Sequence, residues 1–250
     1  MAKQSGLGDN LYIGGFDISG DVGSIDTIGG GPAALDVTGI NKSANERIGG
    51  ERDGSMSFTA FWNPGLTPAE HVVLSTLPTA DVQLMYERGA ILGNPSAVLV
   101  GKQINYDGTR GSDGAFTFKV DAQGDGFGLE WGVQLTAGVR TDVAATNGVG
   151  VDQTTVSTAL GWQAYLQVFG FTGTDATVKI QDSADNSTFA DLAGGAFTQV
   201  TTSTPQGQRL QGGATAVVRR YVRAITITTG GFTSLPFAVM FNRNLTATVF

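Results

Sequence analysis

Side chains that carry catalytic chemistry are scarce in this chain of 250 residues. His71 is the single histidine, and cysteine is absent. Without cysteine there are no disulfides, no thiolate metal ligands and no cysteine nucleophile. A lone histidine with no partner nearby in the sequence disfavours acid–base catalysis at neutral pH. Neither a Gly-x-Ser-x-Gly elbow nor a Walker-type phosphate loop occurs. The sequence therefore predicts a protein that is not an enzyme, with no catalytic residues and no cofactor.

Two weaker motifs are compatible with ligand binding. Asp121 and Asp125 lie in an Asp-Ala-Gln-Gly-Asp-Gly segment that is similar to part of a calcium loop. The segment lacks the other ligands and the closing bidentate glutamate, so we interpret it as a hairpin turn and predict no metal site. Trp162 and Tyr165 are spaced to form a surface aromatic platform that stacks on sugars, although packing in a β-core is the commoner use of such residues.

The elements that would position these side chains are mainly strands. Apolar and polar residues alternate in several segments, which is typical of strands with one face on a core. The clearest segments are 56–62, 82–87, 116–120 and 127–135, followed after residue 160 by 163–169, 176–181, 216–228 and 237–242. The alternation also places Glu87 and Glu130 opposite Tyr86 and Trp131, which predicts that both carboxylates face water.

One helix is expected among the strands. Thr67-Pro68-Ala69-Glu70 fits a capping box with proline at the first helical position, and the helix would run from about residue 67 to Leu77. A glycine-rich, linker-like segment around Ala144 then predicts a domain boundary. We expect an all-β chain with a sandwich domain over residues 1–145, flanked by the helix, and a second β-sandwich or jelly-roll domain over 146–250. Residues 152–250 are expected to be dispensable for assembly, so that a chain ending after Thr146 still assembles.

Charge is divided unevenly along the chain. Residues 1–145 contain 17 acidic and 9 basic side chains, a net charge of −8, and the rest contains 5 acidic and 6 basic ones, a net charge of +1. An acidic first part repels phosphate, which disfavours a domain that grips nucleic acid. The sequence also contains no apolar run long enough to span a membrane and no apolar segment near Met1 that suggests a secretory signal.

A polar, charged and glycine-rich segment covers residues 41–55. Loops of this length within a compact domain are uncommon and usually functional. We expect a loop that is mobile in the monomer and becomes ordered against a neighbouring subunit. Its candidate intersubunit contacts are Glu46, Arg47, Glu51, Arg52 and Asp53.

The order of these features resembles the major tail proteins, or tail tube proteins, of phages with long non-contractile tails. The resemblance rests on the strand start at Gly8–Gly15, the long segment 41–55, the strand Met56–Trp62, the helix Pro68–Leu77 and the strand Trp131–Leu135. It implies stacked hexameric rings around a channel, with a C-terminal decoration domain on the outside. No residue-level functional set transfers from this resemblance.

A tail tube of this kind has known classes of partner, and the resemblance implies the same classes for this chain. The chain would bind itself, the tape measure protein and the tail terminator or distal tail proteins, and it would contact no membrane. Double-stranded DNA would pass through an acidic channel without specific binding. The protein would be assembled in the bacterial host cytoplasm and would reside in the virion tail. Two alternatives remain open: a carbohydrate-binding or adhesive β-sandwich protein that uses Trp162 and Tyr165, and a capsid decoration protein.

Overall fold

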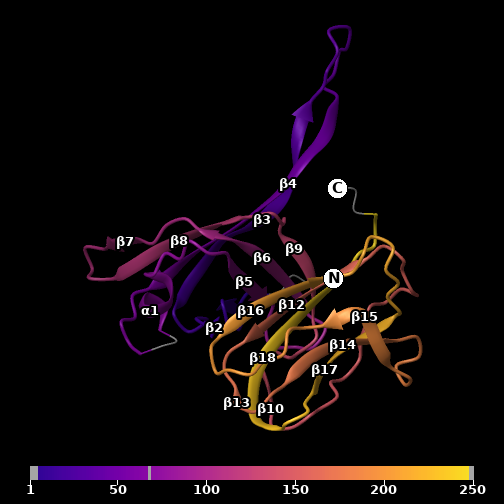
Figure 1. Ribbon diagram of the computed structural model, residues 1–250. Helices are drawn as coiled ribbons and strands as arrows, with labels where there is room; N and C mark the ends of the chain where they lie inside the picture. The colour runs from indigo at the N-terminus through magenta and orange to yellow at the C-terminus, as the bar shows by residue number, and fades with distance from the viewer. Residues whose placement is uncertain (1–4, 67–68, 248–250) are drawn as a thin grey trace. The chain divides into compact units, whose positions relative to one another are not determined.

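The structure is a computed structural model that describes residues 5–66 and 69–247. It is almost entirely β, with one short helix in the described part of the chain (Figure 1). The all-β prediction is confirmed. No helix among the described residues is long and apolar enough to cross a membrane.

The chain divides into two compact units that are interleaved in sequence. Unit 1 comprises residues 1–20, 85–98 and 131–250, and unit 2 comprises residues 21–84 and 99–130. Strands β5 (Val82–Glu87), β6 (Pro95–Gln103) and β9 (Glu130–Gln134) each contain a point at which the chain passes from one unit to the other. The boundary predicted between residues 145 and 146 therefore falls inside unit 1.

Unit 1 is built around two antiparallel sheets. In the first sheet, strand β18 (Phe232–Arg243) is central and pairs with β12 (Trp162–Val168) and with the unit 1 part of β9. Strand β18 also pairs with the short strands β10 (Arg140–Asp142) and β13 (Thr172–Gly173). Strand β12 pairs in turn with β16 (Gln206–Gln211). The second sheet has the order β11 (Val151–Asp152), β17 (Tyr221–Ile227), β14 (Thr177–Ser183) and β15 (Ala190–Ala196). One apolar core lies between the sheets and includes Trp162, Leu166, Ile180, Val222 and Phe241. This arrangement confirms a β-sandwich in the C-terminal part of the chain.

The first residues of the chain belong to the same unit. Strands β1 (Asn10–Ile13) and β2 (Phe16–Asp17) form a hairpin. The Gly15 N–H donates to Gln167 Oε1 at 2.5 Å, and the Tyr12 ring meets Phe169 edge to face at 5.0 Å. Both faces of β12 are therefore covered, which explains why all seven of its residues are buried.

Unit 2 is dominated by one long hairpin. Strands β3 (Val22–Asp36) and β4 (Arg47–Phe61) pair along their lengths, and β4 also pairs with β8 (Phe116–Gly124) from Ser55 to Phe61. Strand β7 (Asp107–Arg110) extends the sheet on β8. The predicted loop at 41–55 is therefore wrong for residues 47–55, which lie in β4. Alternation failed to reveal this part of β4 because its residues from Arg47 to Asp53 contact no core.

The predicted helix is present but short. Helix α1 covers Glu70–Leu74, and Leu77 adopts a φ of 44°, which is outside the helical range. Thr67 and Pro68 lie outside the described residues, so the capping box is not tested in full. Ala69 occupies the N-cap without a side-chain bond, and Glu70 is buried.

A glycine in unit 2 offers a test of this packing. Strands β6 and β8 pair at Gly101, where an added Cβ would lie 2.0 Å from the backbone oxygen of Gln123. Since a backbone atom cannot swing aside, we expect Gly101→Ala to lower the free energy of unfolding by about 1–3 kcal/mol. Denaturant unfolding measures this change. Gly20→Ala is the matched control because an added Cβ there has nothing within 4 Å, and an equal loss in both variants would contradict the packing described.

Candidate assembly surface

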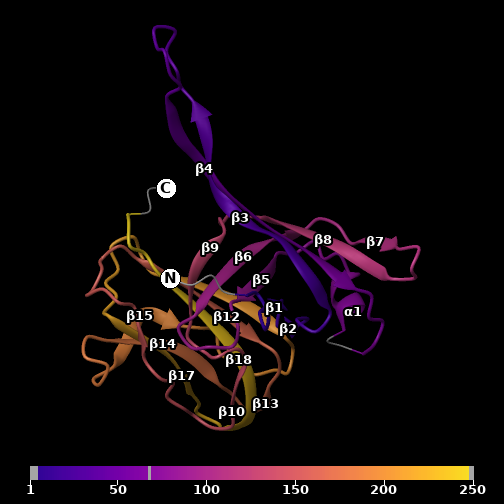
Figure 2. The same ribbon diagram turned by 180° about the vertical axis from the view of Figure 1, so that it is seen from behind.

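The distal half of the β3–β4 hairpin, residues 31–53, lies outside any core and is called the arm below. Figures 1 and 2 show it projecting beyond the part of β3 and β4 that lies beside β8. Among the described residues, its strands pair only with each other. A two-stranded hairpin is marginally stable alone in water, so an arm of this length suits a surface that becomes covered.

The two faces of the arm differ in chemistry. Leu35 and Ile48 are directly paired, and Val37 lies two residues beyond Leu35, so these three apolar side chains share one face. An added Cβ at Gly50 would lie 3.1 Å from Leu35 and 3.3 Å from Ala33, which places Ala33 on the same face. Leu35, Val37 and Ile48 are 48%, 48% and 54% exposed, respectively. The opposite face includes the paired residues Asp36 and Arg47.

The five predicted contact residues all lie in the arm or at its turn. Glu46 closes the turn and pairs with Lys42 at 3.0 Å, and Arg47 opens β4. Glu51 is exposed in β4. Arg52 donates to the Leu129 carbonyl at 3.5 Å, and Asp53 accepts from Gln123 at 2.7 Å, so these two side chains also tie the base of the arm to its unit. Their role between subunits stays a prediction, and the sequence reasoning overlooked the apolar face beside them.

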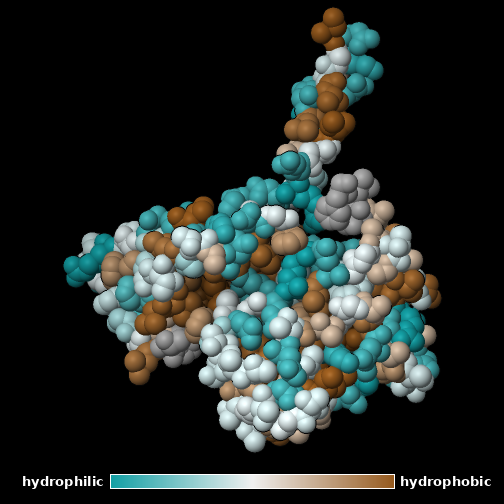
Figure 3. Space-filling model, viewed as in Figure 1, coloured by the Kyte–Doolittle hydropathy of each residue, from teal (hydrophilic) through white to brown (hydrophobic). Residues whose placement is uncertain are grey.

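An aromatic cluster lies at the other end of the same hairpin and is defined by Trp62, His71, Tyr106, Phe116 and Phe118. Trp62 directly follows β4, and its ring lies 5.4 Å from Phe116 and 6.2 Å from His71. Tyr106 stacks on Phe118 at 4.1 Å. Trp62 is 44% exposed, so the cluster presents aromatic surface to solvent. Figure 3 shows apolar surface both along the arm and in the region of α1 and β7.

His71 takes part in a short polar chain beneath this cluster. The Tyr106 hydroxyl lies 3.0 Å from His71 Nδ1 and donates to Glu70 Oε2 at 3.1 Å. Burial raises the pKa of the Glu70 carboxyl, whereas the Tyr106 hydroxyl acts in the opposite direction. The histidine thus helps to fix the aromatic rings against α1.

The predicted sugar platform is wrong. Trp162 and Tyr165 are 0% and 1% exposed, and Trp162 belongs to the core between the sheets of unit 1. Residues three apart on a strand point to opposite faces, so the two rings cannot form one platform. Tyr165 instead accepts a hydrogen bond from Arg209 Nε at 3.0 Å.

The prediction that Glu87 and Glu130 face water is also wrong, because they are 0% and 4% exposed. Neither oxygen of Glu87 makes a hydrogen bond of ordinary geometry within the described residues. Burial raises the pKa of this carboxyl to about 8, the Tyr12 hydroxyl lowers it in part, and the charge of Asp17 raises it further. In β5 both faces are covered, since Tyr86 is buried as well. In β9 the alternation assigned the faces the wrong way round, because Trp131 is 50% exposed and Glu130 is the buried residue.

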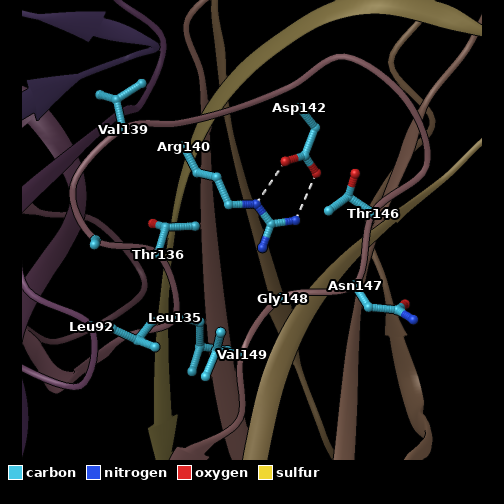
Figure 4. A pocket seen from close by; sticks show the side chains of 11 residues that line it. Leu92, Leu135, Thr136, Val139, Arg140, Asp142, Thr146, Asn147, Gly148 and Val149 are labelled. Atoms are coloured by element: carbon cyan, nitrogen blue, oxygen red, sulfur yellow. Dashed lines mark hydrogen bonds and ion pairs between the residues drawn. The ribbon is translucent and has the colours of Figure 1, made fainter.

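A pocket of about 370 Å³ in unit 1 is lined by Leu92, Leu135, Val139, Val149 and the Arg140–Asp142 pair, among others (Figure 4). Arg140 donates to Asp142 through Nε at 2.9 Å and Nη2 at 2.7 Å, and to the Ala224 carbonyl at 3.1 Å. Its charge is therefore neutralised within the protein, which does not suit an anion site. No group of three or more metal-ligating side chains occurs in the residues that the structure covers.

Comparisons with known proteins give no family. No protein-family model and no curated protein matches the chain. Among solved structures, a chain of the virion of the native gene transfer agent particle has a TM-score of 0.38 and 15% identity, over 52% of this chain and 98% of that one.

Two further structures cover more of the sequence. The SPP1 Dit protein, described as a hub adsorption apparatus of phages that infect Gram-positive hosts, has a TM-score of 0.34 and 12% identity, over 94% of this chain and 99% of that one. A chain of the phage P2 baseplate, in its activated conformation with Ca, has a TM-score of 0.32 and 8% identity, over 94% and 98% of the two chains. All three TM-scores are too low to assign a fold or a function.

Proposed function

We propose that the protein is a non-enzymatic structural subunit of a phage tail, which assembles with copies of itself through the arm. The observation that carries the proposal is the arm, a two-stranded hairpin whose exposed apolar face has no partner in the described residues. Such a surface is typical of protein that becomes buried in an assembly. The resemblance of the sequence to tail tube proteins supports the tail as the assembly.

The finer form of the proposal is a tube of stacked hexameric rings that conducts DNA into the host cell. The net charge of −7 supports a conduit, because an acidic wall repels phosphate and gains nothing from counterion release. Exposed acids that are available for such a wall include Asp107 and Asp113, whereas Asp81 and Asp125 are both paired with Lys102. Tape measure and tail terminator or distal tail proteins are the further partners that the proposal implies. The carbohydrate-binding alternative loses its motive, since Trp162 and Tyr165 are buried.

Shortening the arm tests the proposal. Gly31 and Asp53 are paired, so Asn-Gly in place of residues 32–52 closes the hairpin with a two-residue turn. We expect this variant to fold as the full chain does, because the removed residues are exposed or half-buried and the bond that they lose to the rest of unit 2 is the long one from Arg52 to the Leu129 carbonyl. We expect it to lose assembly completely. Sedimentation velocity and negative-stain microscopy measure the assembly, and thermal unfolding controls for folding. Rings or tubes formed equally well by the shortened chain would overturn the proposal.

A further inference from the structure

The hairpin of β1 and β2 ends in a turn that contacts the backbone of two other strands of unit 1. Gly14 and Gly15 form this turn, and their φ angles of 56° and 86° fit a type I′ turn. An added Cβ at Gly15 would lie 2.3 Å from the backbone nitrogen of Gln206 and 2.4 Å from the carbonyl oxygen of Val168. The tip of the hairpin is therefore inserted against β12 and β16, beside its hydrogen bond to Gln167 (Figure 1).

The chain on either side of this hairpin is anchored separately. Asp9, which precedes β1, accepts hydrogen bonds from the Tyr86 hydroxyl and the Arg88 guanidinium. Asp21, which follows β2 after a short link, accepts from the Glu70 N–H at 3.0 Å within unit 2. The hairpin, residues 10–17, is therefore held at both ends whether or not its tip is docked, and it is called the strap below.

Acidic groups line up across the strap and the strand beside it. Tyr12 and Asp17 are directly paired, so their side chains share one face of the strap. Strand β5 is the neighbour of β1 in the sheet, and its buried Glu87 interacts with both groups. In the part of the chain that the structure describes, these are the groups that act on the Glu87 carboxyl, and neither carries a positive charge. The Arg88 guanidinium is bonded to Asp9 instead, and the nearby end of β6 and the whole of β12 are uncharged.

We infer that the strap opens when Glu87 loses its proton and closes again when the proton returns. An ionised Glu87 in the closed protein is buried near the Asp17 charge without a cation, which is costly. Strand β5 cannot yield easily, because it is paired on both sides, with β6 and with β1. The strap is the edge of this sheet, and β2 has only two residues, so displacing the strap is the least costly way to bring water to the carboxylate.

Opening uncovers one face of β12. Alternate residues of this strand, including Leu166 and Val168, lie in the core between the sheets, so Gln167 lies on the other face. The strap covers that face at Gln167 and, just beyond β12, at Phe169, whose ring meets Tyr12 at 5.0 Å. The open protein therefore presents an amide and an aromatic ring that the strap covers in the closed one. Loss of the proton changes the surface of unit 1 as well as its stability.

Hydrogen exchange of the Gly15 N–H measures the opening. Its rate is followed by NMR in wild type and in Glu87→Gln at several values between about pH 5 and pH 9, and the ratio of the two rates at each pH removes the intrinsic effect of pH on exchange. The pKa of Glu87 is about 8 in the closed protein and the ordinary 4.5 in water. We therefore expect the ratio to rise about tenfold for each pH unit and to level off above about pH 8.

Amides of β14 and β17 separate strap opening from unfolding of the whole unit. These strands pair with each other in the second sheet, away from the strap. Their exchange should be at least about tenfold slower than that of Gly15 at every pH. Equal rates at Gly15 and in β14 would mean that the strap leaves only when unit 1 unfolds, which overturns the inference. A rate ratio at Gly15 that stays constant with pH overturns it as well.

Two further variants keep the test decisive if Glu87→Gln fails to fold. The Tyr12 hydroxyl lowers the pKa of Glu87 and the Asp17 charge raises it. The pH at which Gly15 exchange levels off, after correction for its intrinsic rate, should therefore move up in Tyr12→Phe and down in Asp17→Asn. Asparagine keeps the oxygen that accepts from Ser19, so the link after β2 is preserved. Shifts in the same direction, or no shift in either variant, contradict a strap governed by Glu87.

Discussion

A chain that ends after Thr146 is expected to be insoluble or unfolded. Its β9 and β10 segments would lose β18, with which both are paired in unit 1. Of the buried residues that form the core between the two sheets, only Leu135 precedes residue 146. The β1–β2 hairpin would lose its contacts with Gln167 and Phe169 as well. The remaining part of unit 1 would expose its apolar faces to water.

The soluble fraction and circular dichroism of the truncated chain measure this effect. The variant with the shortened arm is the control. It also lacks part of the chain, but it keeps the core residues of unit 1 and should remain soluble. The sequence alone suggested the opposite result, a tube without its decoration. If the truncated chain folds cooperatively and assembles, then residues 1–146 form a self-sufficient domain and the pairing of β9 and β10 with β18 is dispensable.

Replacement of Glu87 by glutamine is expected to stabilise the protein at neutral and alkaline pH. The pKa of the carboxyl is about 8 in the folded chain, against the ordinary value of 4.5. Between these values the folded state holds one more proton than the unfolded state, so the free energy of unfolding falls by about 1.4 kcal/mol for each pH unit of increase. The stabilisation by this proton is complete below the ordinary pKa of 4.5, and it is lost as the pH rises through the folded pKa of about 8.

Urea unfolding of wild type and Glu87→Gln between about pH 5 and pH 9 measures this slope. The difference in stability between them should grow with pH by roughly 4 to 5 kcal/mol over the whole interval. Glu51→Gln is the control, because Glu51 is exposed on the arm and should give no such trend. Parallel curves for Glu87→Gln and wild type would show that the carboxyl is solvated in the folded protein.

The sequence predicted strands best where one face of a strand meets the core and the other meets water. The segments at Met56–Trp62 and Phe116–Val120 alternate in this way; the first falls in β4 except for Trp62, which follows it, and the second falls in β8. Prediction failed at both extremes of burial. The β4 side of the arm, from Arg47 to Asp53, has no core contact, so its strand pairing leaves no trace in the hydrophobic pattern. Glu87 lies on a strand that is covered on both faces, so its polar character suggested exposure.

The sequence predicted which segment carries the candidate assembly surface, but it did not predict the apolar face of that segment. The charged residues between Glu46 and Asp53 marked the right segment, but the apolar stripe at Leu35 and Ile48 depends on strand register, which the sequence pattern does not give. The division into units was missed for a related reason. Local composition predicts a linker near Ala144, whereas Thr146 pairs there with Thr226, and the contact between Gly15 and Gln167 joins residues 152 positions apart.

The interleaved path of the chain between its units constrains the order of events on the ribosome. Unit 2 is complete once residue 130 has left the exit tunnel, whereas the first twenty residues belong to unit 1 and wait for partners more than a hundred residues downstream. Closure of such distant contacts is slow compared with local pairing. The nascent chain therefore presents a finished arm while unit 1 is still open, and polysomes that bring several such chains together would hold their arms at high local concentration before any copy is released.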